Sequence, residues 1–308
     1  MILNLAEQLR AITLKHLLSV ASIETEWKIR QNIISKALSG KTHPNQKQLV
    51  DLGDKLAEIF QSTGHGDRSQ SSLSGGGKVW EVLVLWYLNL CFAGTHAVAV
   101  TGRFIPKSVK DALRVNYDNR SVKSDTDVVV LSLPELAQEP QEVLAESKLL
   151  KRVDEIIGEN FGKTGVIIVQ TKTHWNDSAQ TPMLWNIIYR QAAAGKMIKN
   201  GFSVGSGLWS VQNLGDFAYA FASVPTNPIA LEYKADQTPV LRVKGMTAGA
   251  FWGHPSKNGV CWSLSEFFIK QFTRNGDIWP NVTNVGKVFI PSSDGKPVCD
   301  IDAFRLKI

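Results

Sequence analysis

Two short, wholly apolar runs constrain the fold of this 308-residue chain more than any other feature. Residues 128–131 read VVVL and residues 166–169 read VIIV, and each run has the length of a strand rather than of a helix. A strand that is apolar on both faces has to be covered on both faces. Residues 140–161, between the two runs, have the spacing of a long amphipathic helix. We therefore predict an α/β (α+β) fold in which helices flank a mixed central sheet.

Changes in pattern divide the chain into four parts. Residues 1–63 form an N-terminal helical segment, and residues 64–78, which are rich in Gly and Ser, are expected to be a flexible loop. Residues 79–225 alternate between helical and strand patterns, and residues 226–308 form a C-terminal α+β part. Within the first part, apolar positions at helical spacing predict three helices, in 3–20, 23–38 and 46–60.

One stretch has almost the length of a membrane span, residues 82–100. Asn89, Gly94 and His96 interrupt it, so we predict a buried helix followed by a short strand, and no membrane partner. The three cysteines are far apart and form no CxxC pair, which favours a reducing compartment and a cytoplasmic location. The formal net charge of +6 permits a polyanionic partner but does not require one.

Polar residues flank the two apolar runs at matching positions. Asp127 directly precedes the first run, with Asp125 two residues earlier, and Gln170 and Lys172 follow the second. Residues two apart on a strand share a face, so pairing of the two strands would bring Asp127 close to Gln170 and Lys172. Oxygen atoms of Asp127, of Gln170 and of the Thr171 backbone suit Mg²⁺. Lys172 beside such an ion could orient a water molecule and offset charge in a transition state.

These residues resemble the motif of the PD-(D/E)XK nuclease superfamily. The matching elements are Glu81 on its helix, Asp127 before its strand, Q-T-K at 170–172, and the helix that starts at Thr181. The resemblance covers about residues 78–195. Two positions depart from the family pattern. Thr126 stands where the motif has Pro, and Gln170 replaces the acidic residue, as in Mrr-like members.

The resemblance implies a Mg²⁺-dependent endodeoxyribonuclease in which Asp127, Gln170, Lys172 and Glu81 are catalytic. A chain of this size without helicase motifs looks most like a type II restriction endonuclease. Such an enzyme works as a homodimer on a palindromic site in double-stranded DNA. Two alternatives remain open: another defence or repair nuclease of the same fold, and a catalytically inactive DNA-binding protein.

Several further residues are candidates for accessory roles. His174 and Asn176 follow the QTK strand and could line the site or contact the DNA backbone. Lys257, in the Gly-rich segment 245–259, is a candidate phosphate contact. The non-catalytic alternative is that Asp125 and Asp127 are turn residues, Lys172 is a solvated charge, and Glu81 is favoured by the helix dipole.

Overall fold

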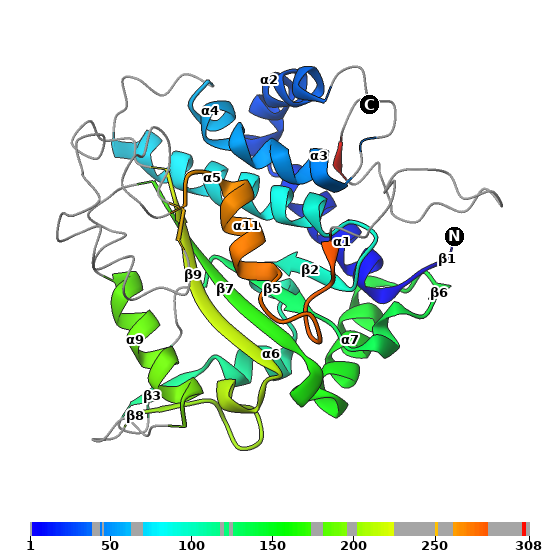
Figure 1. Ribbon diagram of the computed structural model, residues 1–308, viewed down its shortest axis with the longest axis vertical. Coiled ribbons are helices and arrows are strands. Elements are labelled where there is room, and N and C mark those ends of the chain that lie inside the picture. Colours follow the sequence, from blue (N-terminus) through cyan, green and yellow to red (C-terminus); the bar gives the residue numbers. More distant parts are fainter. Residues whose placement is uncertain are drawn as a thin grey trace.

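The central feature of the computed structural model is a five-stranded mixed sheet that crosses the molecule (Figure 1). The residues that the structure describes are 2–38, 44, 46–62, 70–117, 120–122, 126–173, 181–195, 202–224, 250–251, 261–282 and 304–305. The sheet has the order β10-β9-β7-β5-β2. Its strands are β2 (Ala97–Val100), β5 (Val128–Ser132), β7 (Gly165–Lys172), β9 (Asp216–Ser223) and β10 (Ala250–Phe251).

Pairing within this sheet is of both kinds. β2 with β5, and β5 with β7, are antiparallel, whereas β7 with β9, and β9 with β10, are parallel. The predicted mixed central sheet is therefore confirmed. Two smaller antiparallel sheets stand apart from it. They contain β4 (Arg120–Val122), β3 (Val115–Tyr117) and β8 (Phe202–Val204) in one, and β1 (Ile2–Leu3) with β6 (Gln141–Glu142) in the other.

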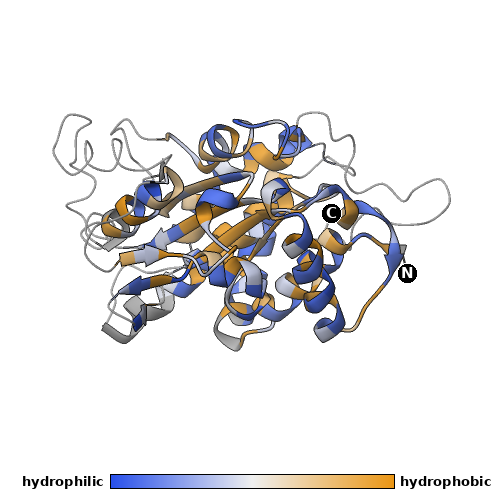
Figure 2. Ribbon diagram, turned by 90° about the horizontal axis from the view of Figure 1, so that it is seen from below, coloured by the Kyte–Doolittle hydropathy of each residue, from blue (hydrophilic) through white to orange (hydrophobic). Residues whose placement is uncertain are grey.

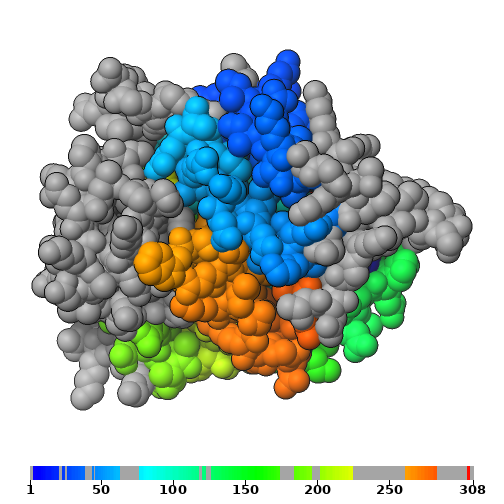
Figure 3. Space-filling view, turned by 45° about the horizontal axis from the view of Figure 1, so that its top comes forward, coloured from blue at the N-terminus to red at the C-terminus, as the bar shows by residue number. Residues whose placement is uncertain are grey.

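Helices cover both faces of the central sheet, as predicted (Figure 1). The described helices are α1 (Leu5–Leu18), α2 (Ala21–Ala37), α3 (Gln46–Asp51), α4 (Leu56–Gln61), α5 (Gln70–Cys91), α6 (Lys107–Ala112), α7 (Glu146–Glu159), α9 (Thr181–Ala193) and α11 (Leu264–Phe272). α11 lies against the N-terminal helices on one face of the molecule, where Figure 3 shows them side by side. Among the described helices, none combines the length and the apolar character that crossing a bilayer requires.

The two faces of the sheet bury separate hydrophobic cores. On β5, Val128 and Val130 belong to the core that contains α5, whereas Val129 and Leu131 belong to the core that contains α7. Strand alternation produces this division, because successive side chains point to opposite faces. Figure 2 shows hydrophobic residues concentrated along the central strands and hydrophilic residues on the outer sides of the helices. The apolar runs of the sequence are thus buried on both faces.

Two helix boundaries differ from the sequence prediction, and one predicted helix is divided. The segment expected to be a loop, 64–78, is helical from Gln70 onward as the start of the 22-residue helix α5. The apolar residues that follow form a stable helix. Adding residues to the N-terminus of an existing helix avoids the free-energy cost of nucleating a new one. The long amphipathic helix starts at Glu146, after the short strand β6, rather than near residue 140. Its predicted amphipathic character is correct.

The predicted helix over 46–60 is divided into α3, a 3₁₀ turn and α4 by the close approach of Gly53 to the core. A side-chain carbon at Gly53 would lie 2.4 Å from the Tyr87 hydroxyl oxygen and 2.5 Å from the Ser265 backbone nitrogen. The Tyr87 hydroxyl donates to the Val50 carbonyl at 2.7 Å. The turn therefore lets the backbone pack directly onto α5 and the start of α11.

A buried ion pair joins α1 to the turn between α5 and β2. Glu7 and Arg10 are each 1% exposed and form a salt bridge with each other. Arg10 also donates to the carbonyl of Phe92 at 2.8 Å, and the Gly94 backbone nitrogen donates to Glu7 at 2.7 Å. These bonds satisfy the backbone groups left unpaired where α5 ends. The pair thus fixes the α5–β2 connection against α1.

We predict that Arg10→Met lowers the free energy of unfolding by about 3–5 kcal/mol, because it leaves the Glu7 carboxylate buried and unpaired. Urea denaturation of the parent and the variant measures this difference. Arg152→Met is the matched control, because Arg152 is half exposed and pairs with Glu155 at the surface. A loss for Arg10→Met as small as that of the control would contradict the structural role of the pair.

Candidate active site

The register of β5 and β7 places Asp127 opposite Gln170. Val128 pairs with Val169 in the antiparallel ladder, so the residue before Val128 faces the residue after Val169. The Gln170 side-chain nitrogen, Nε2, donates to the Asp127 carboxylate oxygen Oδ2 at 2.7 Å. The sequence prediction that these two side chains come together is therefore correct.

Thr171 holds the same carboxylate oxygen through two further bonds. Its backbone nitrogen donates to Asp127 Oδ2 at 2.7 Å, and its hydroxyl donates at 3.0 Å. Three donors thus converge on one oxygen of Asp127. Hydrogen bonds to a carboxylate are stronger than those between neutral groups, so the side chain has a fixed orientation.

The Gln170 amide has the opposite orientation to that of a metal ligand, which would direct its oxygen towards the cation. Its nitrogen faces Asp127, and its oxygen, Oε1, accepts from the hydroxyl of Tyr219 on β9 at 3.3 Å. Gln170 is 1% exposed, so both ends of the amide are buried and both have partners. The carbonyl oxygen that the sequence analysis assigned to the cation points away from Asp127.

The two other residues of the Q-T-K motif lie at the end of β7. Lys172 is its last residue and is half-buried, and alternation places it on the same face as Gln170. The Lys172 carbonyl accepts from the Val224 backbone nitrogen at 2.9 Å, on the β9 side. Neighbouring residues of a strand direct their backbone groups to opposite sides, so the Thr171 carbonyl is directed towards the Asp127 side.

Glu81 reaches this end of the sheet from α5. Its Oε1 accepts from the ammonium of Lys78 at 2.6 Å and lies 3.5 Å from the Thr101 hydroxyl oxygen. The same hydroxyl lies 2.5 Å from the Asp127 backbone carbonyl, to which it donates. Burial raises the pKa of Glu81, and the negative charge of Asp127 raises it further, although Lys78 and Thr101 act in the opposite direction. Glu81 and Asp127 are therefore near enough to repel each other.

The end of the sheet where β7 finishes therefore carries several hard oxygen groups. The carboxylates of Glu81 and Asp127 and the carbonyl of Thr171 are the kinds of group that bind Mg²⁺. A divalent cation bound there would compensate the negative charge that burial, and to a lesser degree Asp127, makes costly on Glu81, so the residues fit such an ion. Within the described residues, no group of three or more His, Cys, Asp or Glu side chains is placed to hold a metal. The candidate ligands proposed for Mg²⁺ do not form such a group, because they include only two such side chains, those of Glu81 and Asp127, together with a backbone carbonyl.

Four predicted residues lie outside the described part of the chain, namely Asp125, His174, Asn176 and Lys257. Two contributors were missed by the sequence analysis, Thr101 and Tyr219. The position of Thr101, directly after an apolar strand, was the available signal. Tyr219 gave none, because an aromatic residue in an apolar strand is typical of a hydrophobic core.

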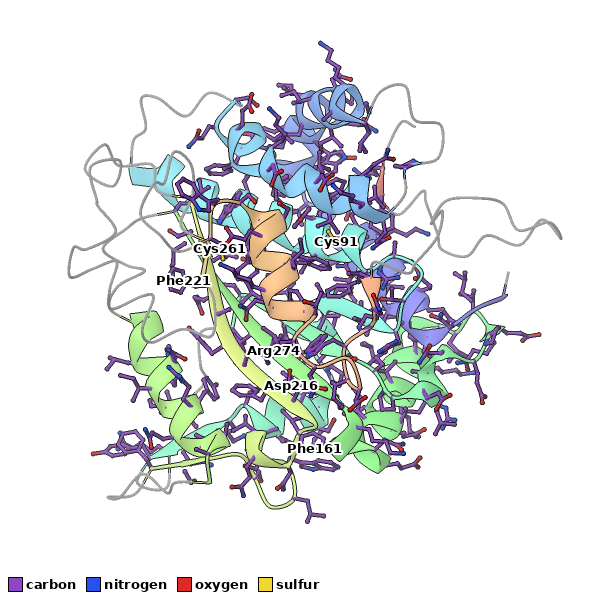
Figure 4. The ribbon with its side chains drawn as sticks, in the orientation of Figure 1. Cys91, Phe161, Asp216, Phe221, Cys261 and Arg274 are labelled. Carbon is purple, nitrogen blue, oxygen red and sulfur yellow. The ribbon has the colours of Figure 1, made fainter. Side chains whose placement is uncertain are left out.

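Further contacts at the other end of the sheet are structural. Asp216, at the start of β9, accepts from the Arg274 guanidinium at 2.6 Å and from the Trp279 ring nitrogen at 2.6 Å (Figure 4). Trp209 packs against Phe161 with ring centroids 5.0 Å apart. Elsewhere, Cys91 and Cys261 are buried cysteines that form no disulfide.

Comparison with known proteins finds no family model that matches this sequence and no curated protein that is similar to it. Function is therefore inferred from the chemistry and geometry of the site.

We predict that Glu81→Gln raises the midpoint of thermal unfolding at pH 7. A pKa raised in the folded state means that ionisation of Glu81 costs stability as the pH rises above the unfolded value of 4.5. The neutral amide removes this cost and keeps an acceptor for Thr101. Unfolding scans between pH 4 and pH 7 measure the effect. The gain is expected to shrink as the pH falls towards 4, and a gain independent of pH would contradict this assignment.

Proposed function

We propose that the chain is a Mg²⁺-dependent endonuclease that hydrolyses phosphodiester bonds of duplex DNA, and more narrowly a type II restriction endonuclease. The observation that carries the proposal is that two acidic residues, Glu81 and Asp127, lie at the end of β7 that carries Thr171 and Lys172. The Thr101 hydroxyl contacts the Glu81 carboxylate and the Asp127 backbone carbonyl. The order of these elements along the chain also agrees with the PD-(D/E)XK resemblance.

In this proposal Glu81, Asp127 and the Thr171 carbonyl hold the cation. Bound Mg²⁺ supplies a Lewis acid for the scissile phosphate and lowers the pKa of a water molecule. The donors on Asp127 Oδ2 keep its carboxylate oriented before substrate arrives. Such preorganisation matters because a site that has to rearrange during the reaction loses part of its catalytic effect.

Lys172 supplies the positive side chain of the site. It stands at the end of β7 with its side chain half-buried, on the face that carries Gln170. An ammonium group there would donate to the attacking water and offset negative charge on the phosphate in the transition state.

The partners follow from the reaction. Cutting both strands of a palindromic site requires two active sites related by a twofold axis, so we propose a homodimer. The formal charge of +6 suits a polyanionic substrate. We place the activity in the cytoplasm, a reducing compartment that suits a chain whose buried Cys91 and Cys261 form no disulfide.

We predict that the purified protein cuts phage DNA into discrete bands with Mg²⁺ and that excess EDTA abolishes cutting. Asp127→Asn and Lys172→Met should each lower the cleavage rate by roughly 100-fold or more, because each removes a charge that stabilises the transition state. Lys151→Met is the matched control, since Lys151 is 80% exposed on α7, and its rate should equal that of the parent.

The pattern of products separates the alternatives. A smear in place of bands would favour a less specific defence or repair nuclease of the same fold. Intact DNA with every divalent metal tried, together with retained DNA binding in a gel-shift assay, would replace the enzyme by an inactive DNA-binding protein. Cleavage by Lys172→Met at the parent rate would exclude the role given to Lys172.

A further inference from the structure

We infer that Gln170 positions the Asp127 carboxylate rather than binding the cation, and that Tyr219 fixes its amide in the orientation this role requires. The inference rests on the proposed function, because it assigns roles within the same site. It differs from the role that the motif implies for this position, which is that of a metal ligand.

The polarity of the Gln170 amide fits a positioning role and not a ligand role. The NH₂ end only donates and the oxygen only accepts, whereas a carboxylate only accepts. Gln170 Nε2 lies 2.7 Å from Asp127 Oδ2, and Oε1 lies 3.3 Å from the Tyr219 hydroxyl oxygen. To bring Oε1 to a cation beside Asp127, the amide would have to turn by half a revolution and break both bonds. With both ends buried, such a turn would be costly.

Tyr219 is held in one position by its neighbours. This residue is 1% exposed, and its ring stacks on that of Tyr189 with centroids 6.0 Å apart. The Tyr189 hydroxyl donates to the Leu113 carbonyl at 2.8 Å, which fixes the second ring from α9. The Tyr219 hydroxyl is therefore held where its proton meets Gln170 Oε1. A chain of donors runs from Tyr219 through Gln170 to Asp127.

The charge required at position 170 also distinguishes the two roles. A ligand at position 170 would work better as a carboxylate, which adds negative charge for Mg²⁺. A positioning residue has to donate to Asp127, which an ionised carboxylate cannot do. Glu at this position would also repel Asp127 across the 2.7 Å that now separates the Gln170 nitrogen from the Asp127 oxygen. The two roles therefore predict opposite effects of Gln170→Glu on Mg²⁺ affinity.

The experiment is a Mg²⁺ titration of the full chain by isothermal titration calorimetry, without DNA. We expect Gln170→Glu and Gln170→Met to weaken Mg²⁺ binding by roughly 10- to 100-fold, the usual effect of losing a partner that orients a ligand. Tyr219→Phe should weaken it by about two- to tenfold. In a Gln170→Met background, Tyr219→Phe should have no further effect, because the chain of donors is already broken.

The controls are Gln138→Glu and Tyr117→Phe, which make the same chemical changes at exposed positions and should bind Mg²⁺ like the parent. Thermal unfolding verifies that each variant is folded, and Gln170→Met decides the question if Gln170→Glu does not fold. Tighter binding by Gln170→Glu, or parent-like binding by Gln170→Met, would overturn this inference while leaving the proposed function intact. A parent that binds no Mg²⁺ would overturn both.

Discussion

The candidate site depends on the antiparallel register between β5 and β7. Val128 pairs with Val169, and this pairing sets Asp127 opposite Gln170. A slip by one residue would move every side chain of a strand to the other face of the sheet. Both strands are buried on both faces, so a slipped register would still bury apolar residues. The polar residues at the strand ends are therefore what distinguishes one register from another. The bonds from Gln170 and Thr171 to Asp127 form only in the observed register, so they favour this register over the others.

A second constraint is the position of α5 relative to β2, because the two elements supply Glu81 and Thr101. They are joined by the short turn that Glu7 and Arg10 hold from α1 through Phe92 and Gly94. The Asn89 side chain adds bonds in both directions with Ala99, at 2.8 Å and 3.0 Å. Helix α1 therefore helps to position the candidate site by fixing the α5–β2 turn, although none of the candidate site residues lies on α1. Loss of the Glu7–Arg10 pair is expected to change the orientation of α5 and with it the position of Glu81.

The sequence predicted those parts of the site that follow from periodicity. Alternation along two apolar strands was enough to bring Asp127 and Gln170 together, because strand pairing leaves few other arrangements. It did not predict the direction of the Gln170 amide, which depends on a tyrosine contributed by a third strand 49 residues away. The predicted start of α5 was also wrong. The low helix propensity of Gly and Ser is outweighed by the stability of the buried helix that follows them. In both cases tertiary contacts decided what local sequence left open.

A neutral residue at position 170 also changes the electrostatics of the site. Burial and Asp127 already raise the pKa of Glu81, so a third carboxylate would add repulsion to a site that resists ionisation. An amide avoids this cost and satisfies one oxygen of Asp127 at the same time. The remaining charge of two carboxylates is typical of Mg²⁺ sites that are completed by substrate phosphates rather than by protein ligands alone. The substitution of Gln for the acidic residue is therefore compatible with a working nuclease, because water completes the coordination of Mg²⁺ in the free site and DNA oxygens replace part of it.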